Sequence, residues 1–116
     1  MKALDHYNQG ERLEQQQANL DAASYSETIP GVCHGAAHHY ICAGLEWAGV
    51  KHGHAYSKHS TRLWQAAIPT EIPTAWDRLD RLLAATFIGE EINGPSAQDA
   101  RTHLATIKGW AQSLHP

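Results

Sequence analysis

Histidine and cysteine gather in the stretch Pro30–Val50, which holds three histidines and two cysteines but only one formally charged residue, Glu46. Imidazole and thiolate are ligands that zinc and iron accept, and imidazole also serves as a general acid or base. His34, His38 and Cys42 follow one another at intervals of four residues. On a helix they drift only about 80° around the axis. They can therefore point together at one neighbouring helix, as ligands do in metal sites of helical bundles.

A competing interpretation treats these histidines as part of the core. A helix that is apolar on nearly every side is normally buried in a bundle, and a buried imidazole needs a hydrogen-bond partner. A metal site would need further ligands from a second helix, but only scattered candidates occur elsewhere, namely His6, Glu11, Glu14 and His103. Neither a Glu-x-x-His nor a His-Glu-x-x-His pair is present. We therefore favour core histidines and expect neither a bound metal nor another cofactor.

Residues 51–62, with the sequence KHGHAYSKHSTR, form a second cluster that holds lysine, arginine and histidine but no acidic residue. In a chain of net charge −3 this is a local positive patch. The start of the helix predicted to follow would also favour an anion. The alternatives are a phosphate or nucleotide contact and an exposed, solvated loop. The candidates for binding an anion or a partner in this patch are Lys51, His54, Lys58, His59 and Arg62.

Arg78 and Arg81 complete this set of candidates, because they lie three residues apart and share one face of a predicted helix. Aspartates flank them in the segment DRLDR. Charges spaced in this way are usually solvated or paired along the helix. The two arginines are therefore candidates whose function depends on what the neighbouring carboxylates contact.

The size and charge of the chain exclude several classes of protein. Its 116 residues are enough for one domain, and 42% hydrophobic and 18% charged residues are typical of a globular chain. A negative net charge argues against an extensive nucleic-acid surface. We find no signal-peptide core and no membrane-spanning run. Cys33 and Cys42 face opposite sides of a helix and cannot pair with each other, so the chain is expected to be cytoplasmic with free thiols.

The periodicity of apolar residues predicts an all-α fold: an antiparallel bundle of four long helices and one short helix. The first three helices are expected over residues 2–25, 32–49 and 58–67. Pro30 and Gly31 are expected to break the chain before the second helix. The fourth helix should open at Thr74 and end by Asn93, and Ser96 should cap the fifth. Sustained alternation of β-branched residues, which would indicate strands, is missing.

The order of these features resembles the HEPN superfamily, which consists of small all-α bundles of four or five helices. In that family a helix rich in Ala, His and Tyr precedes a basic, His-containing loop and a short helix, here AAHHYICAGLEW and KHGHAYSKHSTRLW. The segment AWDRLDRLLAATFIGEEI occupies the place of an Arg-rich helix, and SAQDARTHLATIKGWAQSL that of the closing helix. The resemblance covers about residues 24–114. It implies a single HEPN-like domain over residues 1–116 and a homodimer.

Active HEPN proteins are ribonucleases that carry an Arg, four to six residues and then a His on one helix. No arginine of this chain is followed by a histidine at that spacing. The resemblance therefore implies a non-catalytic module that binds a partner protein, a nucleotide or RNA. Two alternatives stay open: a metal-binding bundle that uses the histidines and cysteine of residues 32–49, and a hydrolase with histidine chemistry that the sequence does not assign.

Overall fold

The structure is a computed structural model that describes residues 2–50, 56–90 and 92–116. These ranges contain α-helices and one short 3₁₀ turn and no strand, which confirms the predicted all-α fold. The elements are α1 (Ala3–Ala18), α2 (Thr28–Trp47), η1 (Tyr56–Lys58), α3 (His59–Gln65), α4 (Glu71–Phe87) and α5 (Gly94–Leu114).

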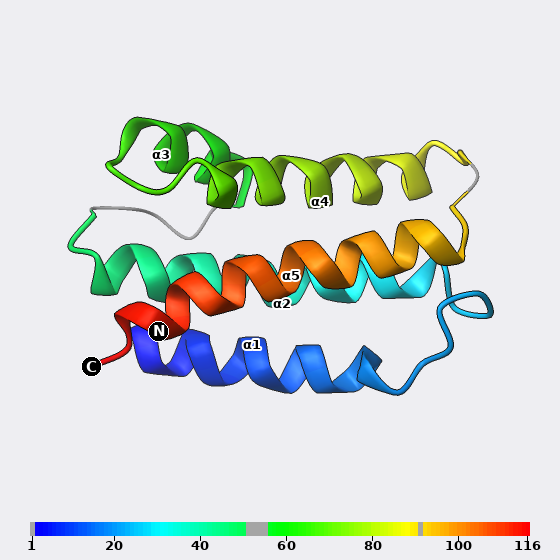
Figure 1. Ribbon diagram of the computed structural model, residues 1–116, viewed down its shortest axis with the longest axis horizontal. Helices are drawn as coiled ribbons and strands as arrows, with labels where there is room; N and C mark the ends of the chain where they lie inside the picture. Colours follow the sequence, from blue (N-terminus) through cyan, green and yellow to red (C-terminus); the bar gives the residue numbers. More distant parts are fainter. Residues whose placement is uncertain (1, 51–55, 91) are drawn as a thin grey trace.

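Helix α2 is the central element and packs against α1, α4 and α5 (Figure 1). Helices α1 and α4 run in one direction, and α2 and α5 run in the other (Figure 1). The short helix α3 packs on the first turns of α4, near the end of α2 (Figure 1). The molecule is elongated, with extents of 39 × 25 × 21 Å, and both termini lie at the same end (Figure 1).

Small residues on α2 explain why so much of it is buried. A methyl group added at Gly44 would lie 2.3 Å from Cζ3 of Trp110, so α5 approaches α2 as closely as a missing side chain permits. On α1, the lack of a side chain at Gly10 leaves room for the ring of Tyr40. A methyl group at Gly10 would lie 2.8 Å from that ring. The hydroxyl of Tyr40 donates a hydrogen bond of 2.7 Å to Glu14. Close backbone approach therefore fixes α1, α2 and α5 as one packed unit.

Helices α2 and α4 begin earlier than the sequence predicted, and the reason is the same in both. Pro30 lies inside the first turn of α2 and Pro73 inside the first turn of α4. A proline is tolerated there because the amides of the first turn have no intrahelical acceptor. The prediction that Pro30 and Gly31 break the chain before the helix was therefore wrong, as was the start of the fourth helix at Thr74.

Other boundaries differ at helix caps. Helix α1 ends at Ala18 and does not reach residue 25, and a turn follows in which the Asp21 carboxylate accepts the amide hydrogen of Ser24. The amide hydrogen of Ser96 is accepted by the side chain of Asn93, so Asn93 and not Ser96 caps α5. Helix α4 ends at Phe87, six residues before that cap.

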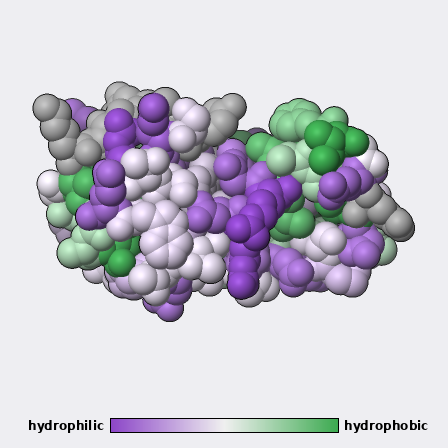
Figure 2. Space-filling view, turned by 90° about the horizontal axis from the view of Figure 1, so that it is seen from above, coloured by the Kyte–Doolittle hydropathy of each residue, from purple (hydrophilic) through white to green (hydrophobic). Residues whose placement is uncertain are grey.

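On the α3 and α4 side, strongly hydrophilic surface crosses the middle of the molecule, and hydrophobic surface lies at both ends, including a cluster toward the end of α4 (Figure 2). Phe87 and Ile88, at that end, are 80% and 71% exposed. None of the described helices combines the length and the apolar character needed to cross a bilayer.

Candidate metal centre

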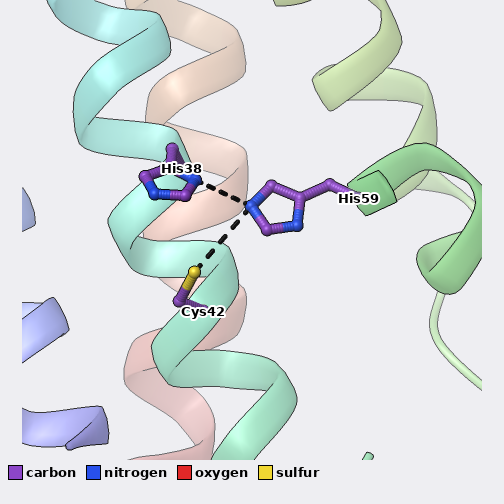
Figure 3. A group of neighbouring side chains, drawn as sticks. All are labelled: His38, Cys42 and His59. Atoms are coloured by element: carbon purple, nitrogen blue, oxygen red, sulfur yellow. Dashed lines mark hydrogen bonds between the residues drawn. The ribbon is translucent and has the colours of Figure 1, made fainter. Parts of the chain in front are cut away.

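His38, Cys42 and His59 bring three potential metal ligands together from two helices (Figure 3). His38 and Cys42 are one turn apart on α2, and His59 is the first residue of α3. Nδ1 of His38 lies 2.9 Å from Nε2 of His59, and Sγ of Cys42 lies 3.8 Å from the same Nε2. All three ligand atoms lie within 4.8 Å of one another. Both side chains of α2 thus converge on one atom of α3.

These separations are close to those of a tetrahedral zinc site. With Zn–N near 2.0–2.1 Å and Zn–S near 2.3 Å, two imidazole nitrogens are roughly 3.3 Å apart and a nitrogen and a sulfur roughly 3.6 Å apart. The observed 2.9 Å between His38 and His59 and 3.8 Å between Cys42 and His59 differ from these values by a few tenths of an ångström. The full set of three ligand atoms spans up to 4.8 Å, so the side chains must draw closer together for all three to reach one ion.

His59 is held in place by the packing of α3. Its side chain is 0% exposed, and Leu63, one turn further along, is 1% exposed, so both anchor the inner face of α3. On the outer face, Nε1 of Trp64 donates a hydrogen bond of 3.0 Å to Asp77 of α4. The buried ring of Trp76 contacts the His59 ring edge-on, with centroids 5.2 Å apart. The packing of α3 and the contact with Trp76 therefore position the imidazole before any ligand binds.

Further histidines continue from this cluster toward α1. The rings of His38 and His39 have centroids 4.9 Å apart, and Nδ1 of His39 lies 2.8 Å from Nδ1 of the buried His6. Burial, reinforced by the charge of Arg12, lowers the pKa of His39. His39 is therefore neutral at pH 7, and a neutral imidazole can accept a hydrogen bond from His6 or donate one to it.

Burial governs the chemistry of the Cys42 thiol. It raises the pKa of Cys42 to about 11, although the nearby Arg62 acts in the opposite direction. One terminal nitrogen of Arg62 is buried and has no hydrogen-bond partner in the described part of the chain. A catalytic cysteine needs a lowered pKa and some exposure. The Cys42 side chain has neither, so the geometry does not favour a cysteine nucleophile activated by His59.

His34, the third residue of the predicted triplet, does not belong to this cluster. Its Nε2 lies 2.9 Å from a carboxylate oxygen of Asp80 on α4, and its ring lies at a tilt against that of Trp76, with centroids 4.5 Å apart. This is the contact with an acid that was expected of a core histidine. The two interpretations of the α2 histidines thus apply to different residues: His34 pairs with a carboxylate, and His38 joins Cys42.

The predicted basic patch is divided between surface and core. Lys58 is exposed, Arg62 is half-buried, and His59 points inward. Lys51 and His54 lie outside the described residues. Arg78 and Arg81 are exposed on α4 and line a cleft with α5, and Arg81 also lines a hollow with Ser60 of α3.

Sequence reasoning identified His38 and Cys42 as possible ligands but assigned His59 to the basic patch. The spacing of four residues on α2 gave a real signal, whereas no local pattern joins it to a histidine 17 residues after Cys42. Comparison with known proteins adds no assignment, since no protein-family model, curated protein or solved structure matches the chain.

Proposed function

We propose that this protein binds one transition-metal ion, with zinc the best fit, through His38, Cys42 and His59. The observation that supports the proposal is the convergence of three ligand atoms from two helices within 4.8 Å. Zinc accepts imidazole nitrogen and thiolate sulfur in a tetrahedral arrangement. This proposal replaces the expectation of no bound metal, which rested on the lack of a ligand from a second helix. His59 supplies that ligand.

A metal ion at this position would change the protonation of Cys42, the attachment of α3 and the coordination that is left open. It takes Cys42 as the thiolate, so binding releases the proton that burial otherwise keeps on the sulfur. It also ties the seven-residue helix α3 to the central helix α2. Three protein ligands leave a fourth coordination position for water or an external ligand, the arrangement of reactive rather than purely structural zinc sites.

A simpler explanation accounts for the three residues without a metal. A hydrogen bond between the His38 and His59 imidazoles satisfies both nitrogens at 2.9 Å. In that explanation Cys42 stays a buried thiol that makes a weak hydrogen bond of 3.8 Å with the same nitrogen of His59. The sulfur is therefore the atom on which the two explanations differ.

Cobalt(II) binding to untagged protein tests the proposal, because cobalt takes zinc sites and a bound thiolate adds a charge-transfer absorption band. We expect one equivalent of cobalt per chain, with that band present in the wild type and in Cys33→Ser. Cys33 is buried on the same helix and is the matched control. Cys42→Ser should lose the band while keeping its helical circular dichroism.

Two results would contradict the proposal. One is a wild-type protein that binds no cobalt at neutral pH. The other is a cobalt spectrum that is identical in Cys42→Ser and the wild type, since the metal would then be held elsewhere on the protein.

A further inference from the structure

A cleft between α4 and α5 lies apart from the His–Cys cluster. It has a volume of about 370 Å³, which is within the range of small-molecule sites. It is lined by Arg78, Arg81 and Leu82 of α4 and by Asp99 and His103 of α5. A second hollow of about 290 Å³ shares Arg78 and His103, so the two follow one seam between the helices.

The carboxylates that neighbour these arginines on α4 are engaged elsewhere. Asp80 bonds to His34 of α2, and Asp77 accepts the indole hydrogen of Trp64 of α3. In the described part of the chain, neither Arg78 nor Arg81 has an ion pair within 4.0 Å. The pairing along the helix that the DRLDR segment suggested is therefore missing among the described residues. Arg78 and Arg81 both line the cleft, and Arg81 also lines a neighbouring hollow with Asp77 and Asp80.

The rest of the lining limits what the cleft accepts. Asp99 is the carboxylate that lines the cleft itself, and the adjoining hollows add Asp77 and Asp80 beside Arg81 and Glu71 beside Arg78. Burial, together with the charge of Arg78, lowers the pKa of His103, which makes this ring a neutral hydrogen-bonding group at pH 7. Leu82 adds apolar surface. The cleft thus offers two positive charges, one neutral polar ring and an apolar side.

We infer that the cleft between α4 and α5 binds a phosphate group, held between the guanidinium groups of Arg78 and Arg81. Guanidinium groups form bidentate hydrogen bonds with phosphate oxygens, and two of them match a phosphate that carries nearly two negative charges. The phosphate comes either free or on a small ester whose remainder contacts Leu82 and His103. The site does not depend on the proposed metal.

Nuclear magnetic resonance of ¹⁵N-labelled, metal-free protein tests this inference, with 150 mM sodium chloride present to screen weak surface binding. Inorganic phosphate, ribose 5-phosphate and ribose are titrated separately. We expect saturable shifts confined to residues near 78–82 and 99–103 with both phosphates and none with ribose. Tighter binding of ribose 5-phosphate would identify an ester as the ligand, and equal binding would identify phosphate itself.

Two variants distinguish specific phosphate binding at the cleft from nonspecific binding to exposed arginines. Arg81→Gln removes an exposed side chain and should weaken phosphate binding at least tenfold without loss of helical signal. Arg12→Gln is the matched control, because Arg12 is an exposed arginine beside Asp5 in a different hollow, on α1. Shifts that do not saturate, that scatter over the surface, or that weaken equally in both variants would show an adventitious ion only and overturn the inference.

Discussion

The two sides of helix α2 solve the problem of burial in different ways. Toward α1 and α5, close packing dominates, since Gly44 admits Trp110 and Tyr40 fills the space left by Gly10. Polar contacts on that side join α2 to α1, from Tyr40 to Glu14 and from His39 to His6. Toward α3 and α4, contacts depend on polar atoms: His34 reaches an acid, and His38 reaches His59. The close packing on the first side fills the space between the helices. The second side concentrates nitrogen and sulfur atoms at one point.

The two cysteines of α2 show the same contrast in a single residue type. Both are fully buried and free, and burial raises the pKa of Cys33 to about 12 and that of Cys42 to about 11. The sulfur of Cys42 lies near an imidazole nitrogen of α3. Cys33 lies within the influence of Arg101 and Glu14, which belong to α5 and α1. Identical side chains on one helix thus differ in whether a second ligand is near.

The largest expected effect is stabilisation by zinc. At a free zinc concentration one hundred times the dissociation constant, binding adds about 2.7 kcal/mol to the free energy of unfolding. For a chain of this size that raises the melting temperature by roughly 10 °C. His38→Gln should lose most of this rise and His34→Gln should keep it, as scanning calorimetry with and without zinc can show. An equal loss in both variants would mean that the two histidines belong to one site.

The packed side of α2 is probed by Gly44→Ala. A methyl group there collides with the half-buried Trp110, so we expect a loss of about 1–3 kcal/mol in the free energy of unfolding by urea. The matched change is Gly109→Ala on α5, where the added methyl group meets no atom within 4 Å beyond its own stretch of helix. That variant should gain up to about 1 kcal/mol from helix propensity. Zinc affinity should be the same in both, and a large change in either would contradict the separation of the two sides.

Alkaline pH tests the burial of Cys33. Its pKa is raised from 9.0 to about 12 in the folded protein, so the folded state keeps a proton that the unfolded chain loses above pH 9. Stability should therefore be fully present below pH 9 and fall above it, by at most about 1.4 kcal/mol per pH unit for this thiol. Urea unfolding at pH 8 and pH 10 should show a smaller fall in Cys33→Ala than in the wild type. Equal falls would mean that Cys33 is accessible to water.

The smallest effect is expected from Asp80→Asn. The Asp80 side chain is 56% exposed, and ion pairs in that setting contribute about 0–1 kcal/mol. The free energy of unfolding should therefore drop by less than about 1 kcal/mol, and cobalt binding should remain within threefold of the wild type. A large loss of cobalt affinity would place Asp80 and His34 in the metal site.

Much of the fold could be predicted because its helices carry strong local signals. The low charge of residues 32–49 indicated a buried helix, and the spacing of Leu104, Ile107 and Ala111 indicated the inner face of α5, where all three are buried. The errors lie at helix boundaries, including the starts of α2 and α4 and the ends of α1 and α4. Proline stops a helix when it lies in the interior and opens one when it lies in the first turn, and sequence alone does not say which applies to Pro30 and Pro73.

The site could be predicted only in part, because its two halves depend on different information. The spacing of His38 and Cys42 is a property of one helix and is visible in the sequence. The position of His59 depends on how α3 packs against α4, through Leu63 and Trp64, and that is a tertiary property. The partner of His34 is likewise 46 residues away. The HEPN resemblance and the homodimer stay predictions, and light scattering tests the dimer by a mass of 12.8 kDa or twice that value.

X-ray absorption at the zinc edge of the loaded, untagged protein tests the central claim most directly, because it counts the ligand atoms around the metal. We predict one sulfur at about 2.3 Å and two imidazole nitrogens at about 2.0–2.1 Å, with one further light atom. The sulfur signal should persist in Cys33→Ser and vanish in Cys42→Ser. A zinc ion surrounded only by nitrogen and oxygen in the wild type would contradict a site at His38, Cys42 and His59.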